Sequence, residues 1–262
     1  MPKPQLGRFN RPQSLAQLTR GRGWNSELAG FLLPFATRDF IYREYDFLND
    51  TITADWTVSN SSGTSAADYA VTETENGTVQ GDTGTTDDGA IQINFDRVIF
   101  DAARNPGMEV RSYLDAVTGF GLEMAFSDAP TTAYTKNTTA VSAAGAPTIT
   151  SNGVTDICGI QMDTDFTLGT ASIFSKGTTD AASGALLGTF LPTAATYFVA
   201  RLQVVQNGGY AIIDDAPGQA ASLILGPDTA KLMRPHVICV TRNTTAKFHD
   251  IDYIRLWAER KA

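Results

Sequence analysis

The sequence predicts an all-β protein, an antiparallel two-sheet β-sandwich with an extended N-terminal arm. The 262 residues include 33 Thr and 23 Gly, and threonine favours pleated strands whereas glycine favours tight turns. From residue 40 onward apolar and polar residues alternate, and no segment there shows about ten residues of helical periodicity. Sheets with one apolar face must bury that face against another layer, which indicates a sandwich.

The clearest strands flank residues Thr118 and Gly119. Apolar side chains alternate over 108–114 and again over 120–126, so we expect an antiparallel pair that turns at this Thr-Gly step. A second hairpin is predicted from 198–204, the turn Asn207-Gly208 and a return at 210–213. The other predicted strands span 41–47, 69–74, 90–95, 97–100, 157–163, 171–175, 234–241 and 247–257. Three low-complexity stretches are expected to be loops: 59–65, 81–89 and 134–153.

The charge divides the chain into two parts, an arm at 1–40 and a sandwich domain at 41–262. Residues 1–23 contain five basic residues and no acid, whereas the whole chain has a net charge of -8. The arm is also too apolar for a solvated tail and is expected to be extended, with short helical turns. It either wraps its own domain or orders on a neighbouring subunit. The expected docking residues are Lys3, Arg8, Arg11, Arg20, Arg22, Trp24 and Phe31.

Several functions are excluded by what the sequence lacks. A net-acidic chain is a poor ligand for nucleic acid, and we find neither a secretory signal nor an apolar run of the roughly 18 residues that a membrane span requires. Cys158 and Cys239 have no metal-ligand spacing, so we expect buried free thiols, no metal site and no cofactor. His236 and His249 lie in predicted strands without a nucleophile elbow and are expected to be structural.

The paired carboxylates are also expected to be non-catalytic. A glycosidase needs two carboxylates, and the candidate pairs here are Asp250 with Asp252 and Glu123 with Asp128. However, two acidic residues at positions i and i+2 near the end of a strand are more typical of a solvated edge. Three acidic clusters could hold a hard cation through oxygen ligands, but they lack the ligand pattern of a calcium loop and are expected to be acidic turns; they are Asp87-Asp88, Asp163/Asp165 and Asp214-Asp215. We therefore expect no catalytic residues and no enzyme.

The closing segment, Lys247-Phe-His-Asp-Ile-Asp-Tyr-Ile-Arg-Leu-Trp257, resembles the last strand of concanavalin A-like jelly rolls. The hairpin at 198–214 resembles the core of laminin G-like sandwiches, and 47–58, with Trp56, resembles their opening strand. The resemblance covers about residues 42–258 and implies a jelly-roll β-sandwich. Glycoside hydrolases with this fold carry E-x-D-x-(x)-E on a central strand. Here E-x-D occurs at Glu44-Tyr45-Asp46 in the first strand without the second Glu, so the resemblance does not imply that activity.

The chain combines the segment Asp-Phe-Leu-Asn-Asp at 46–50, a Thr- and Gly-rich sandwich, the closing segment described above and an N-terminal arm. This combination is similar to virion structural proteins of tailed bacteriophages, in which jelly-roll domains decorate or cement the capsid. This resemblance implies a capsid decoration protein, made in the host cytoplasm and located on the capsid exterior, that bridges subunits of the major capsid protein. A homo-oligomer, with a trimer favoured, and no nucleic-acid or membrane partner are expected. A flexible arm that orders on neighbouring subunits would suit this role.

The alternative is a carbohydrate-binding module or a host-surface adhesin, such as a head fibre or tail protein. Ile251, Tyr253, Arg255 and Trp257 are expected to share one face of the last strand. Tyr253 and Trp257 would then form a carbohydrate platform on which sugar rings stack, although core packing explains the same stripe.

Overall fold

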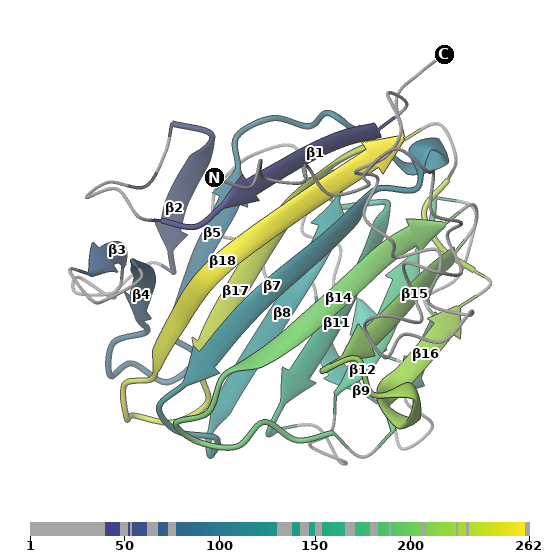
Figure 1. Cartoon of the computed structure of the whole chain (residues 1–262). Helices are drawn as coiled ribbons and strands as arrows, with labels where there is room; N and C mark the ends of the chain where they lie inside the picture. Colours follow the sequence, from purple (N-terminus) through teal and green to yellow (C-terminus); the bar gives the residue numbers. More distant parts are fainter. Residues whose placement is uncertain are drawn as a thin grey trace, which may run out of the picture.

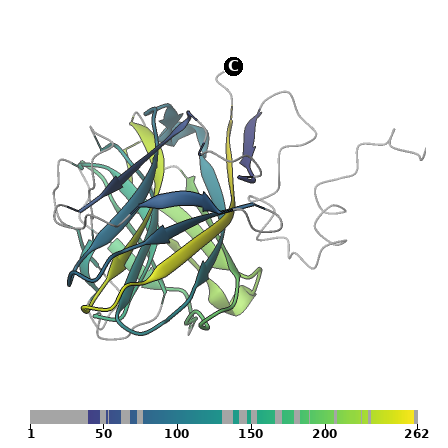
Figure 2. The same ribbon diagram turned by 90° about the vertical axis from the view of Figure 1, so that its left-hand side faces the viewer.

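We describe the protein from a computed structural model. The described residues are 40–259, except 48–51, 53, 62–67, 73–76, 130–137, 142–146, 150–153, 166–170, 179–182, 189, 206–207, 224 and 229–230. They form two eight-stranded antiparallel sheets packed face to face, as the sequence predicts. Sheet A is the front layer in Figure 1 and sheet B lies behind it, and Figure 2 gives the same strands after a quarter turn.

Sheet A has the order β16-β15-β14-β7-β18-β4-β3, and β1 also pairs with β18. The central neighbours β7 and β18 are distant in sequence, because the C-terminal strand enters the middle of the sheet (Figure 1). The strands are β1 (Phe40–Tyr45), β3 (Tyr69–Thr72), β4 (Thr78–Asp82), β7 (Gly107–Leu114), β14 (Phe198–Val205), β15 (Gly208–Ile213), β16 (Ala220–Leu223) and β18 (Phe248–Glu259).

Sheet B has the order β13-β12-β11-β8-β17-β5-β2, and the short β6 pairs with the start of β17. Its strands are β2 (Trp56–Asn60), β5 (Ala90–Phe95), β6 (Phe100–Asp101), β8 (Phe120–Ser127), β11 (Ile157–Asp163), β12 (Ser172–Lys176), β13 (Ser183–Leu186) and β17 (Leu232–Thr241). Two 3-10 helices, η2 (Ala102–Arg104) and η3 (Pro217–Gln219), complete the described part together with a separate pair, β9 (Thr138–Val141) and β10 (Pro147–Ile149).

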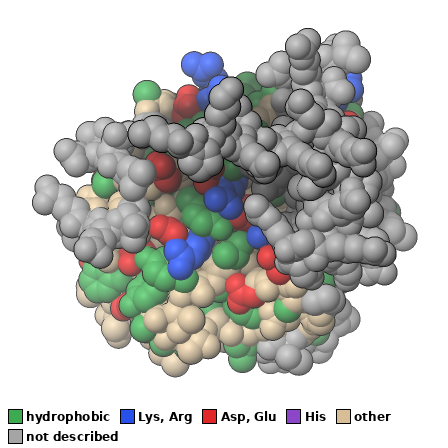
Figure 3. Space-filling view, viewed as in Figure 1, with side chains coloured by type: hydrophobic (Ala, Val, Ile, Leu, Met, Phe, Trp, Pro, Cys, Tyr) green, Lys and Arg blue, Asp and Glu red, His purple; other side chains and the backbone are tan. Residues whose placement is uncertain are grey.

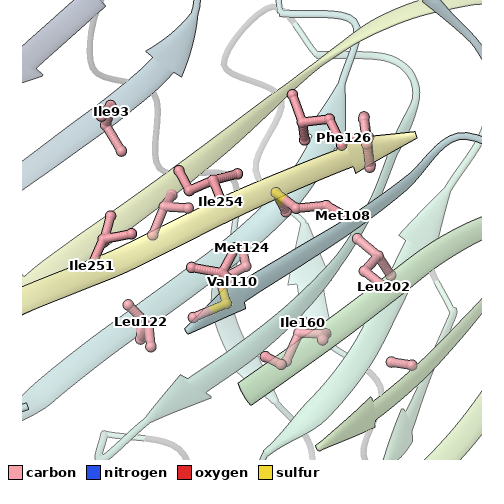
Figure 4. Close-up of a cluster of buried hydrophobic side chains, with 14 of the residues drawn as sticks. Ile93, Met108, Val110, Leu122, Met124, Phe126, Ile160, Leu202, Ile251 and Ile254 are labelled. Atoms are coloured by element: carbon pink, nitrogen blue, oxygen red, sulfur yellow. The ribbon is translucent and has the colours of Figure 1, made fainter. Parts of the chain in front are cut away.

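The core lies between the two sheets and is built from alternate residues of each strand. Met108 and Val110 of β7 meet Leu122 and Met124 of β8 across the layers, with each of these side chains at most 2% exposed. Figure 4 shows this cluster with side chains from both sheets. No described helix has the length and apolar character needed to cross a bilayer.

The predicted hairpin at 108–126 is wrong in its pairing, although both strands exist. β7 lies in sheet A and β8 in sheet B, so residues 115–119 carry the chain from one layer to the other. Both strands have an apolar face, and placing them opposite each other buries both faces at once. Gly119 has φ +62°, a left-handed conformation that glycine adopts without steric cost. The second predicted hairpin is confirmed, since Val205 of β14 pairs with Gly208 of β15.

Other boundaries differ in ways that reflect weak local signals. The strand expected at 97–100 reduces to the two residues of β6, and 134–153 contains β9 and β10 although a loop was predicted. The sequence pattern also missed β4, β13 and β16, which are four or five residues long. Such short segments contain too few alternations to stand out from their loops.

The two cysteines are free and fully buried, as expected. Burial raises the pKa of Cys158 to about 12 and also raises that of Cys239. Because the thiolate is the reactive form, we expect neither thiol to react with Ellman's reagent at pH 8 in the folded protein. Two thiols per chain should react in 6 M guanidinium chloride. Rapid reaction of either thiol without denaturant would contradict this burial.

Candidate functional site

The outward face of sheet A carries a row of alternating charges across its central strands. Glu44 of β1 lies opposite Arg255 of β18, Arg255 lies opposite Glu109 of β7, and Glu109 lies opposite Arg201 of β14. We call these four residues the charged row. Side chains directly opposite each other on one sheet face are close enough to pair, so the strand register alone brings these charges together.

Glu109 is the centre of the charged row and is 3% exposed. Its Oε1 accepts hydrogen bonds from the Tyr253 hydroxyl at 2.9 Å and from Arg255 Nη1 at 2.8 Å, and its Oε2 accepts from Arg201 Nε. Arg255 also contacts Glu44, with Nε and Nη2 at 2.8 and 2.7 Å from Oε1. Both carboxylate oxygens of Glu109 therefore accept hydrogen bonds from neighbouring side chains. This arrangement is typical of a structural carboxylate and leaves no oxygen free to act as a general acid on a substrate.

The pKa shifts in this face follow from burial and from the carboxylates. Burial raises the pKa of Tyr253, and the negative charge of Glu109 raises it further. Burial and the hydrogen bond to Glu44 raise the pKa of Tyr42 to about 12. For Arg255, burial lowers the pKa, but hydrogen bonding to Glu44 and the charge of Glu109 outweigh burial and raise it overall. The tyrosine hydroxyls thus stay protonated and act as hydrogen-bond donors at neutral pH.

Next to the charged row lies a half-buried group of Arg111, Tyr113, Tyr197, Tyr253 and Asp252, which we call the tyrosine patch. The Arg111 guanidinium lies 4.3 Å from the centroid of the Tyr197 ring, and it pairs with Asp252. The rings of Tyr113 and Tyr197 are 5.3 Å apart. Figure 3 looks onto this face and shows basic, acidic and hydrophobic side chains interspersed over sheet A. Partly exposed aromatic rings beside fixed polar groups can stack on sugar rings and bond to their hydroxyl groups.

The predicted arrangement of the last strand is wrong in one respect. A β-bulge between Ile251 and Tyr253 shifts the register, so Ile251 faces the core while Tyr253, Arg255 and Trp257 face outward. A bulge inserts one extra residue and moves the following side chains to the other face. This change could not be read from alternation, which assumes a regular strand.

Of the two residues predicted as a platform, Trp257 is buried and Tyr253 is half-buried. Trp257 is 2% exposed and packs against Ile212, with Tyr42 and Tyr210 at the edge of the cluster. Its ring lies over Gly107, where an added Cβ would be 2.2 Å from Cε2, so the close approach requires glycine. The indole thus packs on the outer face of sheet A, and the Tyr253 ring is the more exposed of the two.

Several of the acidic residues that the sequence singled out contact basic side chains. Arg242 contacts Asp163, Asp88 and Asp165, with Nε 2.9 and 3.0 Å from the two oxygens of Asp163. Asp215 pairs with Arg201. Within the described residues, no group of His, Cys, Asp and Glu has an arrangement suited to a metal ion.

The remaining predicted residues divide between the strands and the arm. His249 is fully buried, where burial lowers its pKa to about 3, and its Nδ1 lies 2.6 Å from the Tyr69 hydroxyl. His236 is 1% exposed on β17, and its Nε2 lies 2.9 Å from Glu123 Oε1. The predicted docking residues lie outside the described residues; they are Lys3, Arg8, Arg11, Arg20, Arg22, Trp24 and Phe31.

Sequence reasoning missed the charged row as a unit. The apolar alternation over 108–114 and 198–204 places Glu109, Arg111 and Arg201 on the side away from the core, where the structure has them. The signal that was lacking is the register, because Glu109 is 92 positions from Arg201 and 146 from Arg255, and nothing local aligns strands that are so far apart in sequence. Charged residues at polar positions of several strands were the available hint.

Comparisons with known proteins identify the fold. No protein-family model matches the chain, and no curated protein sequence matches it. Among solved structures, the carbohydrate recognition domain of Emp47p matches with a TM-score of 0.56 at 9% identity, covering 85% of this chain and 98% of that one. LamA from Zobellia galactanivorans, in complex with laminaritriose and laminaritetraose, matches with a TM-score of 0.55 at 13% identity, covering 85% and 100%.

A protein of unknown function from Shewanella oneidensis MR-1 also matches, with a TM-score of 0.54 at 14% identity over 89% of this chain and 92% of that one. At such identities the likeness concerns the fold. The chain therefore has the concanavalin A-like jelly-roll sandwich that the motif of its last strand indicates.

Proposed function

We propose that the sandwich is a saccharide-binding domain and that the tyrosine patch on sheet A is its binding face. The observation that carries the proposal is the set of half-buried rings held beside fixed charges, with Arg111 over Tyr197 and Tyr253 bonded to Glu109. Rings in fixed positions lose little entropy when a sugar stacks on them. The fold is shared with a carbohydrate recognition domain and with a protein that binds laminarin oligosaccharides, which supports the proposal at the level of the fold.

We infer binding rather than catalysis on this face. The buried carboxylate on the central strand, Glu109, is engaged by three donors, whereas a glycosidase needs two carboxylates with room for a substrate and a water molecule between them. Arg111 has a side chain 40% exposed and Arg255 one 29% exposed, so both present N–H donors that can bond to sugar hydroxyl groups.

A glycan-array screen of the full chain, followed by titration of the best ligand, tests this proposal. Tyr197→Ala should weaken binding up to about tenfold, because an aromatic contact contributes roughly 0.5–1.5 kcal/mol beyond the area that it buries and about 1.4 kcal/mol corresponds to a factor of ten. The matched control is Leu232→Ala, which removes a 51% exposed apolar side chain from sheet B and should leave the affinity unchanged. Equal affinity of both variants would refute a site on the tyrosine patch.

The second candidate function is the capsid decoration protein that the virion resemblance implies. The observation that favours it is the charge asymmetry, since the first 23 residues carry five basic residues and the rest of the chain is strongly acidic. In this proposal residues 1–40 bind the major capsid protein and the sandwich projects outward as an oligomer. Both candidates hold together if the exposed sandwich also contacts host glycans.

Co-sedimentation with capsids that lack decoration proteins tests the second candidate. The full chain should pellet with the capsids, and a chain lacking residues 1–40 should remain in the supernatant. A variant with Lys3, Arg8, Arg11, Arg20 and Arg22 changed to Gln isolates the role of charge. The wild type should bind less at 150 mM than at 50 mM salt, whereas the variant should bind weakly at both salt concentrations. Equal pelleting of the truncated chain would show that the arm is not the anchor.

A further inference from the structure

A half-buried carboxylate, that of Asp250, borders the tyrosine patch on the outer face of sheet A. Asp250 of β18 lies directly opposite Tyr113 of β7 on one side and Gln80 of β4 on the other. The Tyr197 ring, just before β14, follows next to the ring of Tyr113 at 5.3 Å. Figure 1 shows β14, β7, β18 and β4 in this order across the sheet. Side chains opposite each other on one sheet face are close enough to interact, so Asp250 and the two rings form one surface.

The Asp250 carboxylate is held by a neutral donor. The Gln80 side-chain amide donates to its Oδ1 at 2.9 Å, and no basic side chain of the described residues pairs with it. Burial raises the pKa of the Asp250 carboxyl, the hydrogen bond from Gln80 opposes this rise, and the negative charge of Asp115 adds to it. A partly desolvated carboxylate in such surroundings is stabilised by a nearby cation.

The charge around the two rings is net negative. Arg111 lies over the Tyr197 ring, but it already pairs with Asp252. Burial and the charges of Asp250 and Asp252 raise the pKa of Tyr197, and Arg111 offsets only part of this rise. Asp115 accepts a hydrogen bond from a backbone amide at 2.9 Å and has no basic partner in the described part of the chain. This end of the tyrosine patch therefore favours a cationic group over an anionic one.

We propose that the saccharide bound by the tyrosine patch is an amino sugar, with its ring on Tyr113 and Tyr197 and its ammonium group on Asp250. The inference rests on the proposed function and names its ligand class. A charge-assisted hydrogen bond from an ammonium group to a carboxylate is stronger than one from a hydroxyl group. An ammonium group beside an aromatic ring also gains from the negative face of the ring. A neutral sugar could bond to the same carboxylate but would leave its charge uncompensated.

Isothermal titration of the full chain with the tetramers of glucosamine and of N-acetylglucosamine tests the inference, because the acetyl group removes the charge and keeps the sugar ring. At pH 6 the glucosamine tetramer should bind about tenfold more tightly, the equivalent of one hydrogen bond to a charged group. At pH 8.5 the sugar amine has lost its proton, so the preference should disappear. The acetylated tetramer, which does not titrate, should bind equally at both pH values.

The variant Asp250→Asn removes the charge and keeps an oxygen that can accept from Gln80. It should lower the affinity for the glucosamine tetramer about tenfold and leave that for the acetylated tetramer unchanged. The matched control is Asp101→Asn, which removes another half-buried carboxylate near the opposite end of β18, beside Glu259. This control should bind both tetramers like the wild type. Tyr197→Ala should weaken both, because both ligands use the ring.

Three results would overturn the inference. They are equal or weaker binding of the glucosamine tetramer at pH 6, an unchanged preference for it in Asp250→Asn, and an equal loss in Asp101→Asn, which would show a general attraction to the acidic domain. The saccharide proposal would survive each of these results if the acetylated tetramer or a neutral array glycan binds and Tyr197→Ala weakens that binding. If no saccharide binds the full chain, both proposals fail together.

Discussion

Arg242→Met is expected to lower the free energy of unfolding by about 3–5 kcal/mol, the usual cost of removing one partner from a buried ion pair. Asp163 is 2% exposed and loses its two-oxygen contact with the guanidinium. Burial and the charges of Asp165 and Asp88 raise the pKa of the Asp163 carboxyl. The positive charge of the Arg242 guanidinium acts in the opposite direction and favours the ionised carboxylate. In the variant the carboxyl is expected to take up a proton, so the stability loss should be smaller at pH 5 than at pH 8.

The matched control is Arg234→Met, which changes a second buried arginine, on the outer face of sheet B. Arg234 is 5% exposed, and its Nε and Nη1 have no hydrogen-bond partner among the described residues. Burial lowers its pKa, although Asp96 partly offsets this. Removing a buried charge that Asp96 compensates only in part should leave the free energy of unfolding within about 1 kcal/mol of the wild type or raise it. Urea unfolding of both variants measures the difference, and equal losses would contradict the distinction between paired and unpaired arginines.

Glu109→Ala is expected to destabilise the protein by about 3 kcal/mol or more, because it leaves Arg201 and Arg255 without their shared carboxylate. Arg201 is 8% exposed and still pairs with Asp215 in the variant. Glu109→Gln should cost less, since an amide oxygen still accepts one hydrogen bond.

The matched control for this series is Glu44→Ala. Glu44 also pairs with Arg255, but its side chain is 39% exposed, and an exposed ion pair contributes about 1 kcal/mol or less. Chemical unfolding with a two-state fit measures both variants. A loss in Glu44→Ala as large as that in Glu109→Ala would show that burial does not control the strength of the charged row.

The layers of the fold could be predicted because the longer strands each show apolar alternation in their own sequence. The alternation in 120–127 and in 157–163 reports which residues face the core, and β8 and β11 occur where it predicts them. The partner of each strand could not be predicted in the same way. β7 and β8 have the spacing of a hairpin, and only the need to bury both apolar faces places them in different sheets.

The candidate site was harder to predict than the fold, because it depends on contacts between distant strands. Arg201 and Glu109 are 92 positions apart, and Arg255 and Glu109 are 146 apart. The bulge in β18 then moved Ile251 from the predicted outer face to the core. Trp257 was correctly placed on the outer face, but the sequence does not show that Ile212 and Gly107 bury its ring.

The position of β18 also bears on how the protein folds during synthesis. This strand is the last of the described strands in chain order, yet it lies between β7 and the pair β4 and β1 in the middle of sheet A. Sheet A therefore stays divided, with unpaired edges on β1, β4 and β7, until β18 has been synthesised. Long-range pairing of this kind is slow, so stop codons even a few residues into β18 should yield insoluble protein rather than a shortened domain.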